Sequence, residues 1–91
     1  MNKNDLISKV AGDTGLTKSD AANAIESVLD TITAQLASGG EVRLIGFGTF
    51  LVTRRNASTG RNPQTGEKIQ IKAAELPKFR AGKKFKEVVG N

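Results

Sequence analysis

Hydrophobic residues in the first part of the chain recur every three or four positions, the spacing of one helix face. The first stripe predicts a helix over about residues 3–13, and the second predicts a helix that follows Thr17 and ends at Gly39-Gly40. Their combined apolar surface is too large for one short helix to cover, which indicates a helical hairpin that packs against something else. The first stripe contains Leu6, Ile7, Val10 and Ala11, and the second contains Ala21, Ile25, Val28, Leu29, Ile32 and Leu36.

Polar residues and glycines at the expected helix ends agree with these limits. Asn2 and Thr17 each precede a helix, where a side-chain oxygen accepts a hydrogen bond from one of the first unpaired backbone N–H groups. Gly15 is expected to end the first helix in the left-handed conformation.

The hydrophobic pattern changes from helix to strand after residue 41. Val42–Ile45 and Thr49–Thr53 are runs of β-branched and aromatic residues, and the glycines on both sides of Phe47 predict a hairpin between them. Further along, turn-forming residues over Gly60–Gly66 precede the alternating run Lys68–Lys72, which indicates a second hairpin.

The second hairpin has flanks that are polar or weakly apolar, so it cannot pack a core of its own. We expect a two-stranded arm over about residues 54–74, which is mobile unless a partner holds it. A short helix over about Lys83–Val89 is predicted to follow, with Phe85, Val88 and Val89 facing inward.

These elements predict a single α+β domain over residues 1–91. A helical base (1–40) precedes a three-stranded antiparallel sheet (41–91), which carries the long β-ribbon arm and leads into the short C-terminal helix. Without the arm about seventy residues are left, and a lone core of that size supplies only about 3–5 kcal/mol. A two-fold dimer is therefore expected, since the chain has no cysteine for disulfides. The expected dimer core is Phe47, Phe50, Phe79, Ile25, Leu29, Ile32, Leu36 and Leu44.

Charge is unevenly distributed along the chain. Of the 14 basic and 9 acidic residues, three basic and six acidic ones lie in residues 1–41, which gives that half a charge of −3. Residues 42–91 carry +8, so the whole chain carries +5. An acidic half followed by a basic half is typical of a protein that faces a polyanion, most often nucleic acid. The alternative is a solvated lysine-rich surface without a partner.

Composition argues against several classes of function. The chain has no Cys and no His, so it lacks the usual metal ligands, thiol nucleophiles and neutral-pH proton carriers. No enzymatic activity, metal site or cofactor is expected. Its apolar runs are much shorter than the roughly 20 residues that span a bilayer, and a charge precedes any apolar stretch at the N-terminus. A soluble cytoplasmic protein with no membrane partner is expected.

Two glycine-rich segments have superficial similarity to nucleotide-binding motifs. Gly46-Phe47-Gly48 begins like a dinucleotide fingerprint, but Leu51 stands in place of the third glycine. The segment from Gly60 resembles a phosphate-binding loop, but Glu67 stands where a lysine is required. Both segments are interpreted as turns.

Three segments of the chain are distinctive, namely Gly46-Phe47-Gly48-Thr49-Phe50, then Gly60-Arg61-Asn62-Pro63-Gln64-Thr65-Gly66, then Pro77-Lys78-Phe79 with Gly82-Lys83. In these segments the chain resembles the HU and integration host factor family of bacterial histone-like proteins, and within it HU. This resemblance extends from Met1 to about Val89. It implies an intertwined homodimer, or a heterodimer of related chains, with a helical base and two arms that embrace the DNA minor groove.

The resemblance also implies which residues meet DNA. Cationic arm side chains neutralise phosphates, tip side chains donate to minor-groove acceptors, and Pro63 is a rigid wedge for a base step. Lys3, Arg80, Lys83 and Lys86 resemble positions that contact flanking phosphates. The full expected DNA-binding set is Lys3, Arg55, Arg61, Asn62, Pro63, Gln64, Lys68, Lys72, Arg80, Lys83 and Lys86.

The expected function is nucleoid-associated: binding, bending and wrapping double-stranded DNA with little sequence specificity, with kinked or nicked DNA favoured. Ser58 replaces a basic residue found in many relatives, Asn56 is also uncharged, and Phe85 occupies a position that is often aliphatic. Two alternatives stay open, namely RNA binding and a purely structural helical dimer. Against RNA, the arm lacks the aromatic side chains on which single-stranded bases stack.

Overall fold

The computed structural model describes residues 1–90 and contains two compact units. The first unit is Met1–Gln35, and the second begins at Leu36. Helix α1 (Lys3–Thr14) and most of helix α2 (Lys18–Ala37) form the first unit. The second unit holds the strands and a C-terminal helix, α3 (Lys83–Gly90).

Both predicted helix starts are confirmed, at Lys3 after Asn2 and at Lys18 after Thr17. Asn2 caps α1 reciprocally with Asp5: the Asp5 N–H donates to Asn2 Oδ1 at 2.9 Å, and the Asn2 N–H donates to Asp5 Oδ2 at 3.1 Å. The Asp20 N–H donates to Thr17 Oγ1 at 3.1 Å, which caps α2. Gly15 ends α1 with φ 75°, a left-handed conformation.

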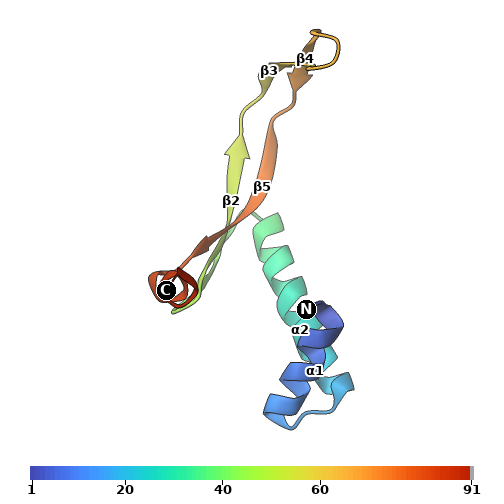
Figure 1. Cartoon of the computed structure of the whole chain (residues 1–91), viewed down its shortest axis with the longest axis vertical. Helices are drawn as coiled ribbons and strands as arrows, with labels where there is room; N and C mark the ends of the chain where they lie inside the picture. The colour runs from blue at the N-terminus through green and yellow to red at the C-terminus, as the bar shows by residue number, and fades with distance from the viewer. Residues whose placement is uncertain (91) are drawn as a thin grey trace. The chain divides into compact units, whose positions relative to one another are not determined.

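The strands of the second unit form two antiparallel ladders (Figure 1). Strands β1 (Val42–Leu44), β2 (Gly48–Arg55) and β5 (Ala74–Ala81) form a sheet in the order β1-β2-β5. Strands β3 (Ser58–Arg61) and β4 (Lys68–Ile71) pair with each other beyond the ends of β2 and β5. The predicted α+β element order is therefore confirmed.

Strand β5 is the part of the sheet that the sequence pattern did not locate. Pro77 lies in the middle of this eight-residue strand, paired with Val52 of β2. Proline lacks an N–H and is tolerated in a sheet only where no ladder bond is needed from it. Because β5 is an edge strand, the side that faces away from β2 has no neighbour in the sheet.

The four phenylalanines of the chain gather at the base of the second unit. We call Phe47, Phe50, Phe79 and Phe85 the aromatic cluster. The Phe47 ring lies 4.8 Å from Phe85 and 5.3 Å from Phe79, and Phe50 lies 4.8 Å from Phe79, measured between ring centroids. These spacings are typical of favourable aromatic pairs, which attach α3 to the sheet.

Little of the expected core is buried within one chain. Among the described residues the buried hydrophobic ones are Ala11, Ala21 and Leu36. Of the expected dimer core, Ile25, Ile32 and Phe50 are half-buried, whereas Leu29, Leu44, Phe47 and Phe79 are exposed.

The expectation that Val88 and Val89 face inward is wrong for the single chain. They are 72% and 71% exposed, respectively. Only Phe85 of the three expected inward residues is half-buried, because its ring is the one that joins the aromatic cluster.

Gly48 lies on β2 against Phe79 and Arg80 of β5, so a side chain there has no room. An added Cβ would come within 2.5 Å of Phe79 Cζ and 2.6 Å of the Arg80 carbonyl oxygen. We expect Gly48→Ala to destabilise the protein by about 1–3 kcal/mol in a denaturant melt, because a backbone atom cannot move aside cheaply.

Gly12 provides the matched control, because an added Cβ there has no atom within 4 Å. Since Gly12 lies inside α1, Gly12→Ala should stabilise by about 0.5–1 kcal/mol. Equal effects at the two positions would contradict the close approach at Gly48.

Candidate nucleic-acid interface

The arm is a two-stranded ribbon whose ladder is interrupted once. The β2–β5 ladder ends at the pair Arg55–Ala74, and the β3–β4 ladder begins at the pair Ser58–Ile71. Two residues are unpaired on each strand, 56–57 on one and 72–73 on the other. Because the numbers are equal, the register is the same on both sides of this interruption. The predicted arm over residues 54–74 is present. It consists of two ladders that share one register and are separated by the unpaired residues.

This register places basic side chains on one face of each ladder. In an antiparallel pair, opposed residues share a face and successive residues alternate between faces. In the β2–β5 ladder one face carries Arg55, Lys78 and Arg80, and in the β3–β4 ladder Arg61 opposes Lys68. All are exposed. We call these five residues the basic face: Arg55, Arg61, Lys68, Lys78 and Arg80.

The opposite face of the ribbon is apolar or neutralised. In the β2–β5 ladder it carries Phe50 and Phe79, members of the aromatic cluster. Its one cation, Arg54, opposes Glu75, with Nη1 and Oε1 3.9 Å apart. The β2–β5 ladder therefore carries its uncompensated charge on one face.

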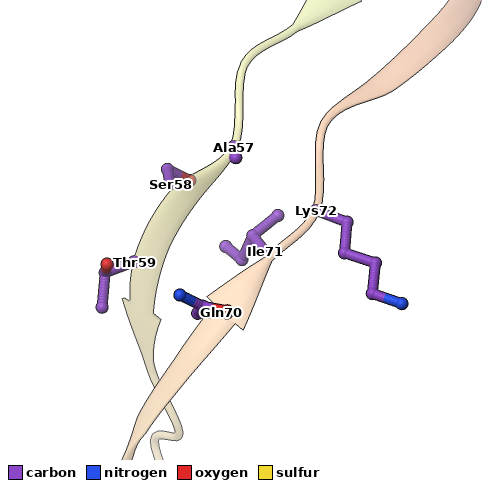
Figure 2. A pocket seen from close by; sticks show the side chains of 6 residues that line it. All are labelled: Ala57, Ser58, Thr59, Gln70, Ile71 and Lys72. Atoms are coloured by element: carbon purple, nitrogen blue, oxygen red, sulfur yellow. The ribbon is translucent and has the colours of Figure 1, made fainter.

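A shallow pocket lies beside the interruption. It has a volume of about 220 Å³ and is lined by uncharged side chains together with Lys72. Figure 2 shows Ile71 between the two strands, while the Lys72 side chain extends away from the ribbon. Arg55 Nη2 donates to the Lys72 carbonyl oxygen at 3.1 Å, so this side chain crosses the interruption. The lining residues are Ala57, Ser58, Thr59, Gln70, Ile71 and Lys72.

The tip of the arm, residues 62–67, is a hydrogen-bonded loop. The Asn62 N–H donates to the Glu67 carbonyl oxygen at 2.8 Å, and the Gly66 N–H donates to the Asn62 carbonyl oxygen at 2.7 Å. Gly66 has φ 73°, which favours glycine. Pro63 and Gln64 are exposed, whereas Asn62 is half-buried. The loop thus presents Pro63 outward at the end of the ribbon.

Besides Arg80 on β5, three expected DNA-binding residues lie outside the arm. Lys83 and Lys86 are exposed on α3, which one intervening residue, Gly82, separates from β5. Lys3 belongs to the first unit, where its Nζ lies 2.5 Å from Glu26 Oε1. The hydrogen bond and the charge of Glu26 raise the pKa of Lys3 above its ordinary value, so the ammonium is held in its charged form.

Lys78 is a member of the basic face that was missing from the expected DNA-binding set. It follows Pro77, which obscured the strand, so the alternation that places it beside Arg80 could not be identified. The sequence did contain a signal for Lys78: it lies two residues before Arg80, and residues two apart on a strand share a face. Within residues 1–90, no helix is long and apolar enough to cross a membrane.

Comparison with known proteins places this architecture in a family. The family model described as "Bacterial DNA-binding protein" matches residues 1–90. The chain is 53% identical over 91 residues to DNA-binding protein HRL18 of Rhizobium leguminosarum, with all of both chains covered. It is 56% identical over 88 residues to DNA-binding protein HU of Streptococcus pyogenes serotype M18, with 97% of each chain covered.

Solved structures of HU proteins share the fold. The Anabaena HU chain from a cocrystal with DNA superposes with a TM-score of 0.91 at 44% identity, covering 98% of this chain and 97% of that one. HU from Thermotoga maritima superposes with a TM-score of 0.71 at 35% identity, covering 98% of each chain. Sequence and structure agree over the whole described length, and the chain belongs to the bacterial DNA-binding protein family that includes HU.

Proposed function

We propose that this chain is an architectural protein that binds double-stranded DNA largely without sequence specificity, bending, wrapping and stabilising it. The observation that carries this proposal is the basic face, five exposed cations in one register along a narrow ribbon. Such a row follows a phosphate backbone without reading base edges. The 44% identical Anabaena HU was crystallised with DNA, which supports the same ligand for this chain. The proposed role is non-enzymatic and belongs to the nucleoid, in the cytoplasm.

The minor groove is the proposed place for the arm. Pro63 is exposed at the tip, where it acts as an apolar wedge between base pairs, while Arg61 and Lys68 flank it with positive charge. Bending DNA costs free energy. Contacts between the DNA phosphates and the cations nearer the sheet offset this cost. DNA that is already kinked or nicked costs less to bend and should be favoured.

The proposed active form is a dimer. The aromatic cluster contains two rings that one chain leaves open, with Phe47 43% and Phe79 40% exposed. Leu29 and Leu44 are similarly exposed, at 44% and 41%. Exposed large apolar side chains of this kind mark an interaction site in each unit, and a second copy gives DNA two arms to hold it. A heterodimer with a related chain is the alternative to a homodimer.

Binding should depend steeply on salt. If a dimer neutralises about five to eight phosphates, log K should fall against log salt with a slope of roughly −4.5 to −7. Random duplexes of equal length should bind within about 1 kcal/mol of one another, because the basic face is proposed to contact phosphates and not the base edges of the major groove. Fluorescence anisotropy at several salt concentrations measures both quantities. A slope near zero, or a strong preference for one sequence, would contradict the proposal.

The ligand class is tested by gel shifts with intact duplex, nicked or kinked duplex and RNA of matched length. We expect the order distorted DNA, then intact DNA, then RNA. Preferential binding of single-stranded RNA would overturn the proposal, and so would binding of none of the three. Secondary binding to structured RNA is compatible with it, since the basic face recognises phosphates that both nucleic acids carry.

A further inference from the structure

The side chain of Asn62 makes a hydrogen bond within the tip loop. Its Oδ1 accepts from the Gln64 N–H at 2.9 Å. A backbone N–H only donates, so the side-chain atom that faces it is the oxygen and not the nitrogen. This contact, with the two bonds made by the Asn62 backbone, ties the residue to Gln64, Gly66 and Glu67.

The bonded atoms lie on either side of Pro63. The proline ring fixes φ of Pro63, and the peptide bonds on both sides are planar. The rotation ψ of Pro63 is therefore the soft torsion between the Pro63 ring and Gln64. The bond from the Gln64 N–H to Asn62 Oδ1 restrains this rotation, as in an Asx turn.

We infer that Asn62 is a positioning residue that holds Pro63 in the orientation needed to enter a base step, and that its oxygen performs this role. The inference rests on the proposed function and changes one part of it, because Asn62 was expected to act as a donor to the bases. The half-buried state of Asn62, between exposed Arg61 and exposed Pro63, agrees with a role inside the loop.

Three substitutions at this position separate the oxygen from the amide nitrogen. Asn62→Ala removes both, whereas Asn62→Asp keeps an acceptor oxygen at the same distance from the backbone and removes the donor. Asn62→Ser keeps a shorter, uncharged acceptor, which controls for the negative charge that aspartate adds. Gln70→Ala is the matched control, since Gln70 is an exposed arm residue on β4 that lies outside both the tip loop and the expected DNA-binding set.

The first measurement uses the full-length free protein. Hydrogen exchange of the Gln64 amide, followed by NMR, should accelerate by roughly 2- to 12-fold in Asn62→Ala, the effect of one ordinary hydrogen bond. Asn62→Asp should retain the parent rate at neutral pH, and Asn62→Ser should lie between. An unprotected Gln64 amide in the parent, or equal rates in the alanine and aspartate variants, would overturn the inference.

The second measurement is DNA bending at saturating protein, read by fluorescence transfer between the ends of a short duplex. We expect reduced bending for Asn62→Ala and parental bending for Asn62→Asp, although aspartate should need more protein to saturate. A base-reading role predicts instead that both variants lose affinity and keep the parental bend. If the parent itself does not bend DNA, the proposed function fails. If the parent and Asn62→Ala bend DNA equally, only the present inference fails.

Discussion

The midpoint of unfolding of this protein is expected to rise with protein concentration. One chain buries few apolar side chains and leaves Leu29, Leu44, Phe47 and Phe79 exposed, so folding and association should be coupled. Each tenfold increase in concentration should then add about 1.4 kcal/mol to the apparent stability. Thermal melts over a hundredfold concentration range, with sedimentation analysis of the mass, test this expectation. A constant midpoint together with a monomeric mass would rule out the dimer.

Phe47→Ala measures how completely a partner covers the aromatic cluster. Removing a fully buried phenylalanine costs about 3–5 kcal/mol. In the single chain Phe47 is 43% exposed, so without a partner the cost should be roughly half as large. A destabilisation near the upper value in a denaturant melt therefore indicates a ring covered from both sides. Phe47→Leu keeps most of the apolar volume and serves as the control, with a smaller expected destabilisation.

The elements that the sequence predicted well are those set by neighbouring residues. The caps at Asn2 and Thr17 each act over three positions, so a short window of sequence contains their whole cause. Strand β5 was not located because Pro77 is compatible with a strand only when that strand is at an edge. Edge position is a property of the whole sheet, which local sequence does not contain.

In the candidate interface too, the sequence predicted the residues but not the arrangement that depends on the whole sheet. Resemblance and charge identified Arg55, Arg61 and Lys68 as cations of the arm, but their common face depends on the register between strands. Lys78 joins them only once β5 is known. Val88 and Val89 were predicted to be inward from helical spacing alone, whereas the contact of α3 with the sheet uses Phe85. Periodicity shows that a face is apolar, and the packing partner decides whether it is covered.

Pro63 and Arg61 are expected to have separable roles in DNA bending. Pro63→Ala removes part of the exposed wedge and no charge, so it should reduce bending and lower the salt slope only slightly, because less of the flanking DNA then reaches the protein. Arg61→Ala removes a cation of the basic face and leaves the wedge. It should weaken binding and reduce the salt slope by about one unit for each phosphate that is no longer neutralised, up to about two for a dimer. Ligase-mediated circularisation of short fragments reports bending, and anisotropy reports the slope.

Distorted DNA distinguishes a wedge from a residue that only shapes the turn. Unstacking a base step costs a few kcal/mol, and at a nicked or mismatched site part of the stacking is already absent. Such DNA should therefore restore much of the bending that Pro63→Ala removes and should not restore the affinity that Arg61→Ala removes. If Pro63 acted only on the loop, the Pro63→Ala variant would bend intact DNA as well as the parent once bound. Distorted DNA would then not improve bending by this variant more than bending by the parent. The wedge role of Pro63 would be ruled out, and bending would be attributed to the cations of the basic face alone.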